Sequence, residues 1–252
     1  MTLPVALGVS IVGLLAWELW ICEGAHFGRR FVVWLYDLAA LRYDGIKHFD
    51  PDWEGKVLGE PLIGLLGDLP GASLLDVGAG TGRTFRAMAR RRKKTGDSRI
   101  RLAIGSQGSA SPAIGHPPAD SGLPQQRLVG LEPSRRMLRL GRDLVSNQVS
   151  WIQGWAVPLP LASETFDAVV CLEVTEFTPR PRSTISELRR VLRPGGWLLI
   201  SNRIGWQAPL ILGRTVSRRR FPGFLSEIGF TDVEVVPWQV DYDMAWARKP
   251  WS

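Results

Sequence analysis

The stretch LLDVGAGTGR at residues 74–83 decides the fold, because a short apolar run leads directly into a glycine-rich loop. The next residues, TFRAMARRRKK, have helical spacing, so the order is strand, glycine loop, helix. Glycine at Gly78, Gly80 and Gly82 lets a bulky ligand approach the backbone while the chain turns tightly into the helix. We therefore predict a buried parallel strand whose carboxyl end holds a ligand of the nucleotide type.

The glycine spacing separates two classes of ligand. A dinucleotide site usually carries G-x-G-x-x-G, whereas this loop reads G-x-G-x-G with Asp76 two residues before the first glycine. This pattern resembles motif I of the class I S-adenosylmethionine-dependent methyltransferases, in which the loop holds the methionine part of the cofactor. The resemblance gives Asp76 the role of ordering the loop and of binding the amino-acid end of the cofactor, directly or through water.

A second acidic residue follows the next apolar strand in RLVGLEPS, residues 127–134. One carboxylate can accept hydrogen bonds from both hydroxyls of a ribose, so Glu132 is the candidate ribose ligand, beside Pro133. The alternative is a carboxylate placed only for the dipole of the helix that follows. Asp76 and Glu132 lie 56 positions apart, where about 20 are usual. The difference predicts a flexible insertion over residues 95–126, rich in Gly, Ser and Pro.

The segment WIQGWAVPLPLASETFDAVVCLEVTEF, residues 151–177, resembles the family pattern written around G-D-A-x-x-L-P-F…S-F-D. Trp155 stands where the family commonly has the aspartate that meets the adenine amino group. The resemblance leaves the backbone amide of Ala156 to meet the base, with Trp155 stacked on it or flanking it. A core or surface tryptophan is the alternative. Leu172, at the end of a strand over residues 168–172, completes the predicted cofactor contacts.

The predicted catalytic position comes from LEVTEF, which resembles an "EV-x-EH" segment of related O-methyltransferases. Phe177 replaces the histidine, which removes an obvious general base and metal ligand. Glu176 is the candidate base if the acceptor is an acidic hydroxyl, and a solvent-facing carboxylate is the alternative. A sulfonium methyl is already activated, so proximity and desolvation can suffice without a base.

Histidines and cysteines give no sign of a metal site or a disulfide framework. His26, His48 and His116 are scattered without metal-ligand spacing, and we infer no zinc site. Cys22 lies in an apolar run and Cys171 in a predicted core strand. The lack of a disulfide pattern favours a reducing compartment.

The N-terminal segment at residues 1–28 differs from the methyltransferase domain that we predict over residues 29–252. Residues 3–22 form an apolar run of 20 residues with one charge, Glu18, which predicts a membrane-spanning helix. Arg29 and Arg30 follow it, and the positive-inside rule then places the domain in the cytoplasm. The alternatives are a buried or interfacial helix and a cytoplasmic protein.

Residues 31–49 read as an amphipathic helix with Trp34, Leu35, Leu38 and Leu41 along one face. Its stretch YDLAALRYD resembles the N-terminal "YD…A…YD" element of the methyltransferases of ubiquinone and menaquinone biosynthesis, which lies over cofactor and substrate. The resemblance makes Tyr36 and Tyr43 candidate substrate contacts, and a simple packing helix is the alternative.

Charge is the main guide to partners. The chain holds 31 Lys and Arg against 24 Asp and Glu, a formal net charge of +7, which favours an anionic partner. A basic run at residues 90–94 suits anionic headgroups, or is a solvated helix end. No aromatic residue interleaves with these cations, which disfavours nucleic acid.

The C-terminal third completes the predicted fold. LRPGGWLLISNR at residues 192–203 is similar to the family's "L-x-P-G-G" turn into a fifth strand, and residues 231–239 and 242–248 read as an antiparallel pair. We expect an α/β, Rossmann-like, seven-stranded and mostly parallel sheet with an N-terminal apolar helix.

The predicted function is transfer of a methyl group from S-adenosyl-L-methionine to a small, lipophilic or membrane-associated acceptor such as a lipid or quinone. Three alternatives stay open: a protein or RNA acceptor, a membrane-tethered scaffold that binds cofactor without catalysis, and a nucleotide-binding oxidoreductase, which the glycine spacing disfavours.

Overall fold

The computed structural model describes residues 3–47, 49–67, 69, 71–95, 126–145 and 147–251. Its centre is a seven-stranded sheet of order β3-β2-β1-β4-β5-β7-β6. The first five strands run parallel, and β7 lies antiparallel between β5 and β6, which confirms the predicted sheet. The strands are β1 Ser73–Val77, β2 Arg127–Glu132, β3 Val149–Gln153, β4 Phe166–Cys171, β5 Leu192–Arg203, β6 Thr231–Gln239 and β7 Tyr242–Arg248.

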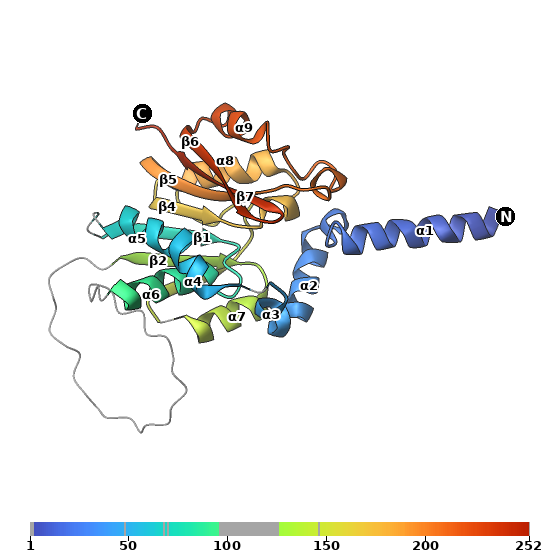
Figure 1. Ribbon diagram of the computed structural model, residues 1–252, viewed down its shortest axis with the longest axis horizontal. Coiled ribbons are helices and arrows are strands. Elements are labelled where there is room, and N and C mark those ends of the chain that lie inside the picture. Colours follow the sequence, from blue (N-terminus) through green and yellow to red (C-terminus); the bar gives the residue numbers. More distant parts are fainter. Residues whose placement is uncertain are drawn as a thin grey trace, which may run out of the picture.

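Helices cover both faces of this sheet (Figure 1). One face carries α5 and α6, and the opposite face carries α8 and α9. The domain helices are α4 Pro51–Glu54, α5 Glu60–Gly67, α6 Arg83–Thr95, α7 Arg135–Leu144, α8 Pro181–Val191 and α9 Phe221–Glu227, with a π-helical turn at Gly55–Gly59. The predicted insertion at residues 95–126 lies, apart from its two end residues, outside the described residues.

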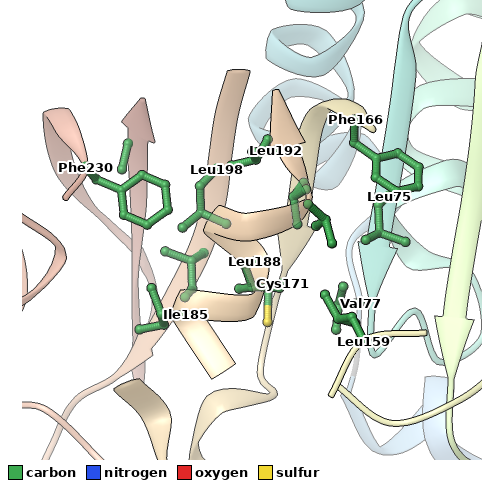
Figure 2. Close-up of a cluster of buried hydrophobic side chains, with 14 of the residues drawn as sticks. Leu75, Val77, Leu159, Phe166, Cys171, Ile185, Leu188, Leu192, Leu198 and Phe230 are labelled. Atoms are coloured by element: carbon green, nitrogen blue, oxygen red, sulfur yellow. The ribbon is translucent and has the colours of Figure 1, made fainter. Parts of the chain in front are cut away.

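The sheet separates two apolar cores. Leu75 and Val77 of β1 face the core that α8 completes with Leu188 (Figure 2). Leu74 faces the other core, with Met88 of α6. Because both faces are covered, all five residues of β1 are buried, including the polar Ser73 and Asp76, and burial does not alternate along the strand.

The N-terminal segment breaks into short helices. α1, Leu3–Trp20, extends from the body of the molecule as an arm (Figure 1). After a turn at Ala25–Phe27, α2 covers Arg29–Ala39 and, beyond a turn at Ala40–Arg42, α3 covers Tyr43–Lys47. The single helix that we predicted over residues 31–49 is therefore interrupted. Asp44 of α3 accepts hydrogen bonds from Thr81 and Arg86, which draws this short helix onto the glycine loop and α6.

Most of the apolar stripe that the sequence marks along α2 and the turn after it faces solvent, whereas Leu35 is half-buried. Trp34 is 52%, Leu38 58% and Leu41 86% exposed, while Val32 on the other side of the helix is buried. Packing on the domain thus uses a different side of α2 from the stripe that the sequence marks.

None of the described helices is long and apolar enough to cross a membrane, so the predicted membrane-spanning helix is not supported. α1 has 18 residues, and Glu18 in its last turn is buried against His26 of the following turn. The rest of the helix presents apolar side chains to solvent, among them Val5, Leu7, Val9, Ile11, Val12, Leu14, Leu15 and Leu19.

Candidate functional site

A cleft lies at the carboxyl ends of β1, β2 and β4. This is the switch point of the sheet, where β1 has β2 on one side and β4 on the other, and open α/β sheets bind ligands there. The structure brings most of the predicted cofactor residues to its walls: Gly78, Gly80, Glu132, Pro133, Trp155, Ala156 and Leu172.

The three glycines of the loop do different things. All have positive φ, at 73° for Gly78, 53° for Gly80 and 80° for Gly82. Gly78 and Gly80 line the cleft, whereas Gly82 does not. A Cβ on Gly82 would lie 2.5 Å from Cγ2 of Val145, so this glycine allows the start of α6 to pack closely on the end of α7.

Glu132 is held at the end of β2 by two backbone groups. Its Oε2 accepts a hydrogen bond from the N–H of Gly80 at 2.9 Å, and its Oε1 accepts one from the N–H of Ser134 at 2.8 Å. Burial raises the pKa of Glu132 to about 7, although both hydrogen bonds favour the carboxylate. A carboxylate offers about four acceptor sites, so each oxygen keeps capacity for a ligand hydroxyl.

Asp76 lies one layer deeper, inside β1, and it does not line the main cleft. It lines a smaller adjoining pocket, together with Gly78, Tyr43 and Glu173. Burial raises the pKa of Asp76 to about 7, against the hydrogen bond from Thr84 and the charge of Arg83. The position therefore suits contact with the polar end of a ligand that fills the cleft.

Trp155 has a partner that the sequence did not reveal. The guanidinium of Arg29 lies over its indole ring at 4.6 Å, and Nη1 of Arg29 donates a hydrogen bond to the carbonyl of Val157 at 3.1 Å. Both residues line the cleft. In the sequence, Arg29 stands out only as a charge that follows the apolar run, and no local pattern predicts that it lines the cleft.

Tyr36 and Tyr43, the predicted substrate contacts, form an aromatic wall of the cleft together with Phe177. The rings of Tyr36 and Tyr43 lie 5.8 Å apart, and Tyr36 meets Phe177 edge-on at 5.8 Å. All three line the cleft. Burial raises the pKa of both tyrosines, so their hydroxyls stay neutral.

Glu176, the candidate base, does not face the cleft. It is buried, and its Oε1 accepts a hydrogen bond from the hydroxyl of Tyr242 at 2.6 Å. It borders a separate small pocket beside Asn202 and Arg203. The geometry thus gives this carboxylate a structural place and no access to the acceptor side of the cleft.

Glu173, three residues earlier, is the carboxylate that lines the cleft. It has a positive φ of 57° and accepts hydrogen bonds from Nζ of Lys47 at 2.6 Å and from Nη1 of Arg83 at 2.7 Å. Burial favours the neutral acid, but Lys47 and Arg83 together hold the pKa of Glu173 below its ordinary value. Its only sequence signal was its position as the first acidic residue of LEVTEF.

The basic run is partly neutralised by the helices beside it. Arg90 pairs with Asp52 at 2.7 Å, and Arg91 pairs with Glu60 at 3.0 Å. These two arginines therefore fasten α6 to α4 and α5, and they are not a free cationic surface.

Comparison with known proteins agrees with this geometry. The family described as "Methyltransferase domain" matches residues 104–200. A mitochondrial 2-methoxy-6-polyprenyl-1,4-benzoquinol methylase of Danio rerio is 30% identical over 146 residues, which cover 54% of this chain and 44% of the relative. A ubiquinone biosynthesis O-methyltransferase of Xanthomonas oryzae pv. oryzae is 31% identical over 137 residues, covering 53% of this chain and 44% of the relative. The chain thus spans less than half the length of either relative.

Solved structures share the fold. The [4+2]-cyclase SpnF superposes with a TM-score of 0.61 at 19% identity, covering 89% of this chain and 97% of that protein. A possible histamine N-methyltransferase of Thermotoga maritima gives a TM-score of 0.53 at 17% identity, covering 89% and 98%. The chain is thus similar in sequence to methyltransferases over about half of its length, and it shares the fold of these solved structures.

Proposed function

We propose that the protein transfers a methyl group from S-adenosyl-L-methionine to a small, lipophilic acceptor that it meets at a membrane. The observation that carries the first half is Glu132, which is fixed by the N–H groups of Gly80 and Ser134 at the switch point of the sheet. The proposal of a lipophilic acceptor at a membrane rests on the aromatic wall of the cleft and on the apolar arm beside it.

The residues of the cleft fit the cofactor of this family. Glu132 has acceptor capacity for the two ribose hydroxyls, and Asp76 in the adjoining pocket can meet an ammonium group. Gly78 and Gly80 present bare backbone to the cleft. Trp155, with Arg29 over its ring, offers an aromatic wall for a base, in place of the aspartate common in relatives.

Methyl transfer at this site depends more on positioning the acceptor in line with the methyl group than on removal of a proton by a general base. The bound cofactor supplies a methyl group on a positively charged sulfur, which is already activated toward nucleophiles. Glu173 is a poor base, since Lys47 and Arg83 stabilise its charged form. Tyr36, Tyr43 and Phe177 exclude water and hold an apolar acceptor in line, an effect worth up to about 7–11 kcal/mol.

A membrane source for the acceptor follows from what surrounds the cleft. α2 contributes Arg29 and Tyr36 to the cleft wall and presents Trp34 and Leu38 to solvent on its other side. α1 precedes it directly and exposes apolar side chains on every side. We propose that α1 inserts into a lipid layer, with the domain on its cytoplasmic side, and that a quinone or another lipid reaches the cleft past α2.

Relatives act as a guide to the acceptor. Two proteins similar to this chain are named for a polyprenyl benzoquinol and for ubiquinone biosynthesis, and a third is a demethylmenaquinone methyltransferase. An isoprenoid quinone precursor fits an apolar cleft next to an apolar arm, and it is our preferred class.

The test supplies cofactor labelled in its methyl group to membranes that contain the full chain. We expect label in the lipid extract, and Asp76→Ala should abolish it while Glu227→Gln, an exposed surface variant, retains it. Label in protein or RNA would replace the lipid acceptor with one of those classes. Cofactor binding with no label in any fraction would leave a non-catalytic scaffold and overturn the proposal.

A further inference from the structure

A group of three different metal-ligating side chains lies outside the cleft, where α1 meets the domain. Among the described residues, Glu18, Cys22 and His26 bring a carboxylate oxygen, a thiol sulfur and an imidazole nitrogen within 4.8 Å of one another. Glu18 lies in the last turn of α1 and Cys22 in the bend that follows it, and the turn at Ala25–Phe27 folds His26 back onto them. The three residues stand four positions apart in the sequence, but this spacing matches none of the usual zinc motifs, and the sequence therefore led to the inference of no zinc site.

The partners of His26 and Glu18 match those of a metal site, while the thiol of Cys22 donates a hydrogen bond to the carbonyl oxygen of Leu210 at 3.7 Å. Nδ1 of His26 faces Oε2 of Glu18 at 2.7 Å, while Nε2 of the same ring lies 3.0 Å from the carbonyl oxygen of Leu212. A metal-bound imidazole almost always donates its other N–H to a carbonyl or carboxylate, which fixes the ring. The second oxygen of Glu18 accepts a hydrogen bond from the N–H of His26 at 2.7 Å, so the carboxylate is also oriented.

The burial of the three side chains and a path from solvent to His26 also suit a metal site. Cys22 and Glu18 are buried, and the side chain of His26 is 26% exposed, which leaves an entry path at the imidazole. Trp17 stacks on the His26 ring at 5.3 Å and holds it against the helix end. A sulfur, a nitrogen and an oxygen together are a ligand set that Zn²⁺ accepts in tetrahedral geometry, with a fourth position open to water.

We propose that Glu18, Cys22 and His26 form a zinc site that locks the end of α1 to the domain. Zn²⁺ takes the place of the proton between Nδ1 of His26 and Oε2 of Glu18 and binds the thiolate of Cys22, and both displaced protons, one from this pair and one from the thiol, are released to solvent. The Nδ1 and Oε2 atoms move apart by a few tenths of an ångström to admit the ion, and the sulfur moves toward them. Because His26 also contacts Leu212, the ion fixes the direction in which α1 leaves the domain.

The test uses the full chain without a polyhistidine tag, freed of metal by a chelator. Titration with Zn²⁺ against a chromophoric chelator should give one tight equivalent, and Zn²⁺ should raise the melting temperature. Co²⁺ in its place should give the near-ultraviolet charge-transfer band of a cobalt–thiolate bond. Cys22→Ala should remove this band and weaken Zn²⁺ binding at least tenfold.

Cys171→Ala is the matched control, since Cys171 is the second buried free cysteine and lies in β4, away from the cluster. It should keep the cobalt–thiolate band and the zinc affinity. The proposal is overturned if the chain takes up no stoichiometric Zn²⁺, or if Cys22→Ala binds it as tightly as the parent. Should Cys22→Ala fail to fold, the parent spectrum decides: a missing cobalt–thiolate band overturns the site, and a band that persists in Cys171→Ala supports it.

Discussion

Asp76 and Glu132 sit in surroundings that disfavour their own charge. Burial raises the pKa of each to about 7, from ordinary values of 3.8 and 4.5. A carboxyl group whose folded-state pKa is raised binds its proton more tightly in the folded chain. The free energy of unfolding of the cofactor-free protein therefore falls as the pH rises from about 4 to about 7, and the penalty is complete above that range. Ligand groups that donate hydrogen bonds to these carboxylates offset it.

Cofactor affinity should follow the ionisation of Glu132. We predict that the dissociation constant for S-adenosylmethionine rises about tenfold for each pH unit below about 7, because only the carboxylate can accept from both ribose hydroxyls. Glu132→Gln should weaken binding by about 10–100-fold at pH 8, since hydrogen bonds to a charged acceptor are worth about 1.5–3 kcal/mol each. Isothermal titration calorimetry across this pH range measures both effects.

Two controls separate this effect from a general loss of structure. Glu227→Gln changes an exposed carboxylate paired with Arg182 and should leave affinity and its pH dependence as in the parent. Glu132→Gln should flatten the pH dependence as well as lower the affinity. Equal pH profiles in the parent and in Glu132→Gln would show that another group controls binding.

The strand–loop–helix element at β1 and α6 was predictable because its signals are local. A continuous apolar run, glycines at fixed offsets and a helical period all lie within residues 73–95. The same locality explains the failures. Nothing near Glu176 announces its hydrogen bond to Tyr242, 66 positions away, and nothing near Arg29 announces Trp155.

The solvent exposure of the apolar side chains of α2 was a second property that the local sequence pattern could not predict. The apolar stripe of α2 predicts a buried face, yet Trp34 and Leu41 are exposed while Val32 is buried. A period of 3.6 residues marks a stripe, but the surroundings that cover it are set by tertiary contacts or by a membrane.

Within the glycine loop, we predict that substitution of Gly80 mainly affects cofactor binding and that substitution of Gly82 mainly affects stability. Gly80→Ala places a Cβ 3.5 Å from Met137, which leaves room for it in the fold, but the methyl group stands at the cleft wall. It should weaken cofactor binding at least tenfold and lower the free energy of unfolding by about 1–2 kcal/mol, from its positive φ. Gly82→Ala meets Val145 at 2.5 Å, so it should lower that free energy by about 2–4 kcal/mol.

Binding per folded molecule should stay within about threefold of the parent in Gly82→Ala, because Gly82 lies outside the cleft. Denaturant unfolding and calorimetry give the two quantities independently. Gly223→Ala in α9, where a Cβ meets nothing within 4 Å, serves as the control and should stabilise slightly. If Gly82→Ala lost affinity as strongly as Gly80→Ala, the division of roles within the loop would be wrong.

Across the whole molecule, three features converge on the junction after α1. The apolar arm leaves the body there, the candidate zinc ligands lie at its base, and α2 begins there and forms part of the cleft wall (Figure 1). An arm fixed in direction at this junction would hold the cleft at a constant distance from the surface into which the arm inserts. The junction after α1 would then determine both the orientation of the domain and the access of the acceptor to the cleft.

Vesicle flotation tests this arrangement. The parent chain should float with vesicles of phosphatidylcholine and phosphatidylglycerol, whereas Val9→Asp combined with Val12→Asp should remain at the bottom of the gradient, since each aspartate in an apolar layer costs about 3 kcal/mol. Val240→Asp alters an even more exposed apolar residue in the turn after β6 and should float like the parent. The double variant should keep its affinity for S-adenosylmethionine in solution but lose methyl transfer to an acceptor held in the vesicles. A parent chain that stays at the bottom, or that elutes as a dimer whose interface protects α1, would assign the arm to protein association instead.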